Sequence, residues 1–106
     1  DITTLGLISL KMISISCNEK YKLYHNGDQA NTIYIQRTGQ AKMFYNDGKI
    51  RILKRGDVFG EHGLYMKFRD NTVICDTLCE FYVINIMDIL HITPIYYIFI
   101  VQLVIH

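Results

Sequence analysis

The chain has 106 residues, half of them hydrophobic, and its eleven Lys and Arg against ten Asp and Glu leave a formal net charge of +1. A chain of this size can bury one hydrophobic core, so we expect a single domain over 1–106. No basic run stands out that could neutralise a series of phosphates, and a nucleic-acid partner is therefore not expected.

Three cysteines form an odd number without a Cys-x-x-Cys pair, which predicts a reducing compartment. We expect Cys17, Cys75 and Cys79 to be buried or idle thiols. A zinc site would need further Cys or His at ligand spacing, and the nearest candidates, His62 and His91, are distant in the sequence. Neither a metal nor a resident cofactor is expected.

The two ends of the chain suggest a piece of a longer protein. It begins at Asp1 without a methionine or a signal peptide, and it stops within an apolar run over 95–105. That run is shorter than the roughly 20 residues that a membrane span needs, so we expect a helix buried against protein. The predicted location of the domain is the cytosol.

Short β-rich segments separated by turn signals predict a mainly β fold of the sandwich or barrel kind. A lead-in over 1–11 is expected to open with a short helix. The alternation of side chains over 11–17 and over 32–36 is typical of half-buried strands.

The sequence pattern predicts two β-hairpins. Segments 40–45 and 49–54 are joined by Asn46-Asp47-Gly48, whose Asp-Gly pair favours a tight hairpin turn. Segments 72–76 and 79–85 are β-branched and aromatic with almost nothing between them, so we predict a second hairpin there.

The C-terminal part, 86–106, lacks turn signals apart from Pro94. It is expected to form two helices, with Pro94 in the first turn of the second, where a missing backbone N–H is tolerated.

One segment, 56–73, breaks the rhythm of strands and turns with three glycines, an acid and an arginine. Glycine allows the backbone to approach a phosphate closely, and arginine offers a charged fork that matches phosphate oxygens. A short helix beginning near Glu61 would aim its free N–H groups at an anion. Because Glu61 would repel that anion, it is better suited to accept hydrogen bonds from ligand hydroxyls.

These residues point to a family. Phe59-Gly60-Glu61, followed by Arg69 and Thr72-Val73, resembles the phosphate-binding cassette of cyclic-nucleotide-binding domains. Upstream, Gly27-Asp28 and Ile33-Tyr34-Ile35 are similar to the turn and strand that precede that cassette in the family. The landmarks agree in order and spacing over about 12–90.

The resemblance implies a mainly β fold, an eight-stranded antiparallel β-roll that is jelly-roll-like, over 12–85. It also implies a short cassette helix within 56–73 and two C-terminal helices over 86–106. The second of these would be the start of the lid helix that closes over the base.

The resemblance further implies the roles of individual residues. Glu61 would bind the ribose 2′-hydroxyl, Arg69 would pair with the cyclic phosphate, and backbone amides beside them would complete the cradle. The expected ligand-binding residues are Gly60, Glu61, His62, Arg69, Asp70 and Asn71.

The chain departs from the family after the arginine, where Asp70 and Asn71 replace a small residue or Thr and then Ala, and the loop from Glu61 to Arg69 is one residue short. An acid beside the phosphate would weaken the binding of a monoanion by ~1 kcal/mol or more. Without Thr at position 70, a feature that favours cGMP in the family is missing, which leaves a lean to cAMP.

Simpler explanations stand beside these. Glu61 and Arg69 could form an intramolecular ion pair that closes the loop. His62 has no companion at metal-ligand spacing and is more typical of a solvated or capped side chain. No Ser-His-Asp or Cys-His grouping is suggested, and the histidines are too scattered for the metal chemistry of cupin barrels, so no enzyme activity is expected within this chain.

We therefore predict a regulatory domain that binds a cyclic nucleotide and transmits binding through its C-terminal helix to a larger protein. That parent protein is expected to be membrane-embedded, an ion channel or transporter, and to form a homo-oligomer. The alternative is a degenerate cyclic-nucleotide-binding fold in which Asp70 and Asn71 have closed the site and which serves subunit assembly. The apolar run 95–105 favours this alternative, because such a helix must be covered by protein.

Overall fold

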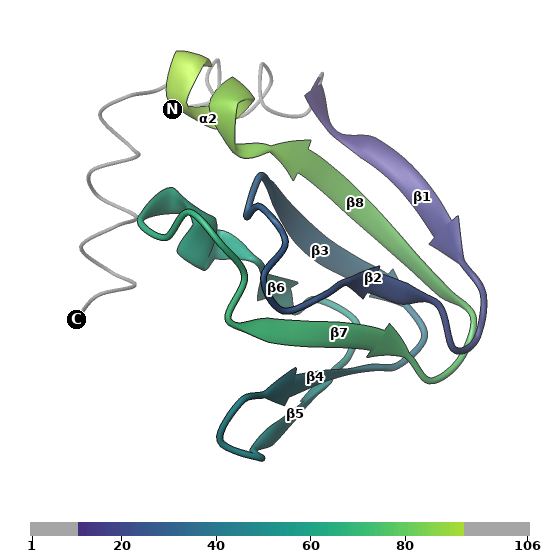
Figure 1. Cartoon of the computed structure of the whole chain (residues 1–106). Coiled ribbons are helices and arrows are strands. Elements are labelled where there is room, and N and C mark those ends of the chain that lie inside the picture. Colours follow the sequence, from purple (N-terminus) through teal and green to yellow (C-terminus); the bar gives the residue numbers. More distant parts are fainter. Residues whose placement is uncertain (1–10, 93–106) are drawn as a thin grey trace.

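A computed structural model describes residues 11–92 of the chain (Figure 1). Eight strands, one short 3₁₀-helix and one α-helix make up this part. In chain order they are β1 (Ile13–Cys17), β2 (Lys22–Tyr24), β3 (Thr32–Thr38), β4 (Ala41–Tyr45), β5 (Ile50–Leu53), β6 (Val58–Phe59), η1 (Glu61–Leu64), β7 (Asn71–Cys75), β8 (Cys79–Asn85) and α2 (Ile86–Ile92).

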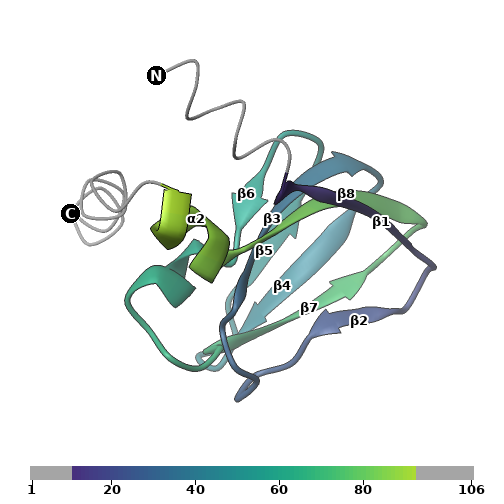
Figure 2. The same ribbon diagram turned by 90° about the horizontal axis from the view of Figure 1, so that it is seen from above.

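The strands form two four-stranded sheets, with the orders β1-β8-β3-β6 and β2-β7-β4-β5. Every strand pairing within them is antiparallel. Figures 1 and 2 show the two sheets facing each other as a roll, with α2 and η1 together at one end. The predicted mainly β, eight-stranded roll is confirmed.

The first predicted hairpin, β4 with β5, is confirmed in position and register. Phe44 lies opposite Ile50, and the Tyr45 amide donates to the Lys49 carbonyl at 2.9 Å. Gly48 closes the turn with φ of 89°, a left-handed conformation that glycine adopts without a steric penalty. The sequence pattern was sufficient here because the turn itself specifies the pairing.

The second predicted hairpin is wrong, because β7 and β8 belong to different sheets. The Asp76 amide donates to the Gln40 carbonyl at 2.9 Å, and the Gln40 amide donates to the Thr77 hydroxyl at 3.0 Å. The chain is thus tied to the start of β4 as it leaves one sheet, and it enters the other at Cys79, opposite Cys17. A short connection between two β segments does not reveal which sheet the second strand joins.

Aromatic side chains fill the core between the sheets. The rings of Tyr34 and Phe59 stack with centroids 5.3 Å apart, and Phe81 meets the Phe59 ring edge-on at 5.8 Å. Phe59 and Phe81 are fully buried, which contributes roughly 1.5–3 kcal/mol of hydrophobic stabilisation for each side chain. Phe59, the residue before Gly60 in the cassette, is therefore an anchor of the core.

A second apolar cluster lies at the helical end of the roll. Ile33 of β3 and Ile84 of β8 are buried there against Leu64 of η1 and Ile89 of α2. Packing of η1 against this cluster fixes the position of the segment that carries Glu61. The helix α2 matches the first predicted C-terminal helix, whereas the predicted helices within 1–10 and after Pro94 lie outside the described residues.

Candidate functional site

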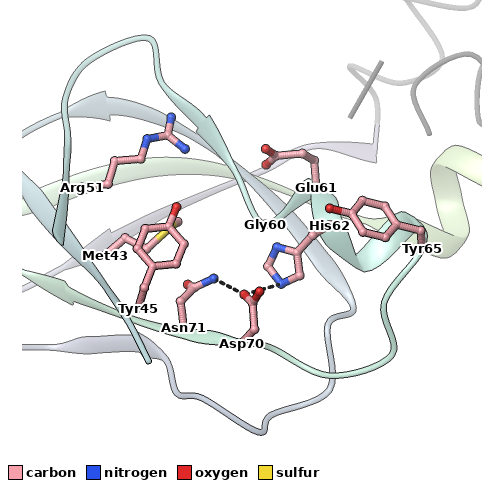
Figure 3. Close-up of a pocket in the computed structure, with 9 residues that line it drawn as sticks. All are labelled: Met43, Tyr45, Arg51, Gly60, Glu61, His62, Tyr65, Asp70 and Asn71. Carbon is pink, nitrogen blue, oxygen red and sulfur yellow. Dashed lines mark hydrogen bonds and ion pairs between the residues drawn. The ribbon is translucent and has the colours of Figure 1, made fainter. Parts of the chain in front are cut away.

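A cavity of about 160 Å³ opens beside η1, between the cassette segment and the strands β4, β5 and β7 (Figure 3). Five of the six predicted ligand-binding residues line this cavity, and Arg69 does not. The lining residues are Met43, Tyr45, Arg51, Gly60, Glu61, His62, Tyr65, Asp70 and Asn71.

Gly60 ends the β6 segment and begins η1 with φ of 87°. A Cβ atom at this position would come within 2.8 Å of the Thr32 carbonyl oxygen and 3.0 Å of Arg69 Nη1. Only glycine fits, because both the left-handed backbone and the close approach exclude a side chain. The predicted short helix near Glu61 is confirmed as a four-residue 3₁₀ turn.

Arg69 is buried, with 3 % of its surface exposed, and its guanidinium is held by backbone. Nη1 donates to the Gly60 carbonyl at 2.9 Å, and Nη2 donates to the Thr32 carbonyl at 2.7 Å and its hydroxyl at 3.1 Å. The guanidinium carbon lies 4.2 Å from the centroid of the Tyr24 ring, which adds a cation–π contact. Burial lowers the pKa of Arg69, although Tyr24, Tyr34 and nearby carboxylates oppose this shift.

No ion pair joins Arg69 to Glu61 within the described residues. The acceptors of Arg69 are backbone and hydroxyl oxygens, so the simple explanation of the Glu61–Arg69 pattern as a loop-closing salt bridge does not describe this geometry.

Several buried polar atoms at this place have no hydrogen-bond partner among residues 11–92. They are Glu61 Oε2, His62 Nε2, Asn71 Oδ1 and Arg69 Nε. Each buried donor or acceptor that lacks a partner costs about 1–3 kcal/mol. A polar ligand that forms hydrogen bonds with these atoms would remove this cost. Glu61 and Asn71 offer acceptors, and Arg69 offers a donor.

His62, Asp70 and Asn71 form a short polar series along one wall of the cavity (Figure 3). Asn71 Nδ2 donates to Asp70 Oδ1 at 2.7 Å, and the same oxygen lies 3.9 Å from His62 Nε2. Burial lowers the pKa of His62, the positive charge of Arg69 lowers it further, and Asp70 opposes the shift. The carboxylate of Asp70 is therefore partly turned toward neighbouring side chains.

Four cavity residues were missed in the sequence: Met43, Tyr45, Arg51 and Tyr65. Met43 lies opposite Arg51 in the β4–β5 hairpin, and both face inward. The alternation of β5 gave no signal for Arg51, because Ile50 and Ile52 on either side of it are exposed although they are apolar. The usual strand pattern would place the isoleucines inward and the charged side chain outward, whereas in β5 Ile50 and Ile52 point outward and Arg51 shares the inner face with the fully buried Leu53.

Three further features bear on function. Among the described residues there is no cluster of three or more His, Cys, Asp or Glu side chains that could bind a metal ion. Within the same residues no helix is long and apolar enough to cross a membrane. All three cysteines are free and buried, as predicted.

The chain forms a β-roll with a cavity at its helical end, and comparison with known families shows which family this fold belongs to. The sequence profile of the cyclic nucleotide-binding domain matches residues 16–93, most of the chain. The chain belongs to the cyclic nucleotide-binding domain family.

Relatives with curated functions are much longer. A cGMP-dependent protein kinase of Plasmodium berghei (strain Anka) is 37% identical over 61 residues, which are 51% of this chain and 7% of the kinase. A cGMP-dependent protein kinase of Toxoplasma gondii is 38% identical over 56 residues, which are 50% of this chain and 6% of the kinase. This chain therefore spans only a small part of such proteins.

Solved structures share the fold at low sequence identity. The sensor domain of the transcriptional regulator DNR from Pseudomonas aeruginosa has a TM-score of 0.79 and 13% identity, over 89% of this chain and 70% of that chain. The c-di-GMP responsive global regulator CLP from Xanthomonas campestris has a TM-score of 0.73 and 18% identity, over 91% of this chain and 50% of that chain.

Proposed function

We propose that this domain binds a purine cyclic nucleotide in the cavity beside η1. The observation that carries this proposal is the placement of unsatisfied buried atoms around Gly60: the Nε donor of Arg69 and the Oε2 acceptor of Glu61. A cyclic nucleotide has complementary groups, since its phosphate oxygens accept hydrogen bonds and its ribose hydroxyl donates one. Glu61, which lines the cavity, is then the hydroxyl acceptor. Arg69 lies behind Gly60 and outside the cavity lining, so its guanidinium must turn toward the cavity to donate to the phosphate, the role that the family resemblance implies.

The charges near the cavity support an anionic ligand of small net charge. Arg51 is a cavity-lining cation, and Arg69 lies behind Gly60 with its charge uncompensated by any carboxylate contact within the described residues. Glu61 and Asp70 line the same cavity. A cyclic monophosphate carries one negative charge, which this balance tolerates better than the two charges of a linear monophosphate.

The choice between cGMP and cAMP depends on evidence of two kinds. The residue after Arg69 favoured cAMP in the sequence, because it is Asp70 and not Thr. Two of the relatives with curated functions are named cGMP-dependent protein kinases, which favours cGMP. We propose cGMP as the ligand to test first, with cAMP as its competitor.

We further propose that binding regulates the remainder of a longer cytosolic protein and that this domain performs no reaction itself. The relatives favour a protein kinase as the parent, where the sequence alone suggested a channel or transporter. The expected homo-oligomer and the absence of a nucleic-acid partner stay predictions. A ligand can shift such a regulator only as far as it binds its two conformations differently.

One observation favours the alternative of a non-binding fold. Asp70 places a carboxylate in the cavity wall beside the expected phosphate position, where a negative charge opposes an anion. In that case the domain would serve assembly with other subunits or domains.

Thermal unfolding with added nucleotides distinguishes these functions. We expect millimolar cGMP to raise the melting temperature, and 5′-GMP at the same concentration to have a much smaller effect. A ligand present at ~100 times its Kd adds about 2.7 kcal/mol to the stability of the folded state. No rise with either cGMP or cAMP would contradict the binding function and favour the assembly alternative.

A further inference from the structure

His62 occupies a position in the cavity wall where a proton would change the charge that faces the ligand. Its imidazole lies between Gly60 and Asp70, with one ring nitrogen directed to Asp70 and the other on the cavity side (Figure 3). Nε2 is buried, has no hydrogen-bond partner within 11–92, and lies 3.9 Å from Asp70 Oδ1. The ring thus has a carboxylate positioned to stabilise its charged form, and among the described residues no hydrogen bond at Nε2 holds the neutral form.

Charged and titratable groups surround this ring from every element beside it. The helix η1 contributes one acid and the residue that follows it a phenol, the segment before β7 contributes an acid and a cation, and the β4–β5 hairpin lines the same cavity. These groups are Glu61, Tyr65, Arg69, Asp70, Tyr45 and Arg51.

In the free domain these surroundings favour neutral imidazole. Burial is the first cause of the lowered pKa of His62, and the positive charge of Arg69 is the second. An anionic phosphate beside Arg69 would neutralise the second cause and would add its own attraction for a proton on the ring. Asp70 already acts in the same direction, since it raises the pKa of His62.

We propose that His62 takes up a proton from solvent when the cyclic nucleotide binds, so that the affinity of this site rises as the pH falls. This inference rests on the proposed function. Protonation of His62 would also give Asp70 a favourable partner, because its carboxylate, which would otherwise repel the ligand, would pair with the imidazolium.

The direction in which the affinity changes with pH follows from the linkage between proton binding and ligand binding. A group that binds a proton more tightly in the complex than in the free domain makes the affinity rise as the pH falls between the two pKa values. Histidine has an ordinary pKa of about 6.5 and the pKa of His62 in the free domain lies below that value, so the change is expected between about pH 7.5 and pH 5.5. We expect the Kd for cGMP to fall about 3- to 10-fold over this interval.

The test is titration calorimetry of the 106-residue chain with cGMP at pH 5.5, 6.5 and 7.5, repeated at pH 6.5 in two buffers of different ionisation enthalpy. Wild-type chain should take up a measurable fraction of a proton per bound nucleotide. His62→Gln should remove both the uptake and the dependence of Kd on pH. His25→Gln is the matched control, because His25 is exposed in the turn before Asp28 and should leave both unchanged.

The outcomes distinguish a failure of cGMP binding from a failure of the role of His62. Absence of cGMP binding at every pH would contradict the proposed function. Binding with a flat pH profile, with proton release, or with a profile that His62→Gln retains would overturn the role of His62 and leave the proposed function intact.

Discussion

Arg69 holds Thr32 with one guanidinium nitrogen, which donates to the Thr32 carbonyl at 2.7 Å and to its hydroxyl at 3.1 Å. The second terminal nitrogen holds the Gly60 carbonyl. A single side chain therefore joins the start of β3, the start of η1 and the segment before β7. The residue expected to bind the phosphate is also a structural bridge of the roll.

Replacing Arg69 by alanine should destabilise the domain as well as its complex. Arg69→Ala leaves the buried carbonyls of Thr32 and Gly60 without their donors, so we expect a loss of about 2–4 kcal/mol in the free energy of unfolding. Arg69→Lys keeps the charge but not the fork, and should cost about half as much. Urea denaturation without ligand measures both. An alanine variant as stable as wild type would show that these hydrogen bonds contribute nothing.

A methyl group at Gly60 should be more harmful than one at another left-handed glycine. Gly60→Ala places a Cβ within 2.8 Å of the Thr32 carbonyl oxygen, whereas a Cβ at Gly48 meets nothing within 4 Å. Both variants carry the backbone penalty of about 1–2 kcal/mol, and only Gly60→Ala adds the clash. We expect a loss of about 2–4 kcal/mol for Gly60→Ala in chemical denaturation. Equal losses for the two variants would argue against the close packing at η1.

We expect Glu61 to contribute to the affinity for the ligand and not to the stability of the fold. Its Oε2 is buried without a partner within the described part of the chain, so Glu61→Gln removes no internal hydrogen bond of that atom. Loss of a charge-assisted bond from a ligand hydroxyl should raise the Kd for cGMP by about 10- to 100-fold. Titration calorimetry measures this. Glu19→Gln, which makes the same charge change at an exposed turn, is the control and should bind like wild type.

The buried thiols predict a loss of stability at high pH. Burial, together with the neighbouring Cys79, raises the pKa of Cys75 from 9.0 to about 12. The folded state therefore favours the neutral thiol, and this contribution is present below about pH 9 and lost as the pH rises toward 12. Melting temperatures between pH 8 and 11 should fall more for wild type than for Cys75→Ala.

The same burial predicts inert cysteines. At pH 8 the native domain should not react with an aromatic disulfide reagent, because the thiolate is the reactive species and all three thiols are buried. Rapid labelling of any of them in the folded domain would contradict the packing between the sheets.

The sequence was most informative where local chemistry decides the structure. The Asp47-Gly48 turn specifies the β4–β5 pairing, and the glycine at position 60 marks the only kind of residue that its φ of 87° and its neighbours admit. The strands β2 and β6 are too short, at three and two residues, to show a periodicity. The expected number of eight strands therefore came from the family resemblance and not from the pattern.

Contacts between residues that lie far apart in the chain could not be predicted from the sequence. The turn at Thr77 looks like a hairpin because both flanking segments are β-rich, yet its hydrogen bonds lead to Gln40 and the chain changes sheets. Arg51 was missed because an inward-facing arginine between exposed isoleucines reverses the usual strand pattern. That Arg69 would be held by Thr32, 37 residues away, has no local signature.

Nucleotide binding in the cavity beside η1 is tested by a titration of isotope-labelled chain with cGMP, followed by the amide resonances of residues 11–92. We expect saturable shifts concentrated at Gly60–Gly63, at Asp70 and Asn71, and on the β4–β5 hairpin beside them. The absence of saturable shifts with cGMP and with cAMP, or shifts confined to another face of the roll, would contradict nucleotide binding in this cavity.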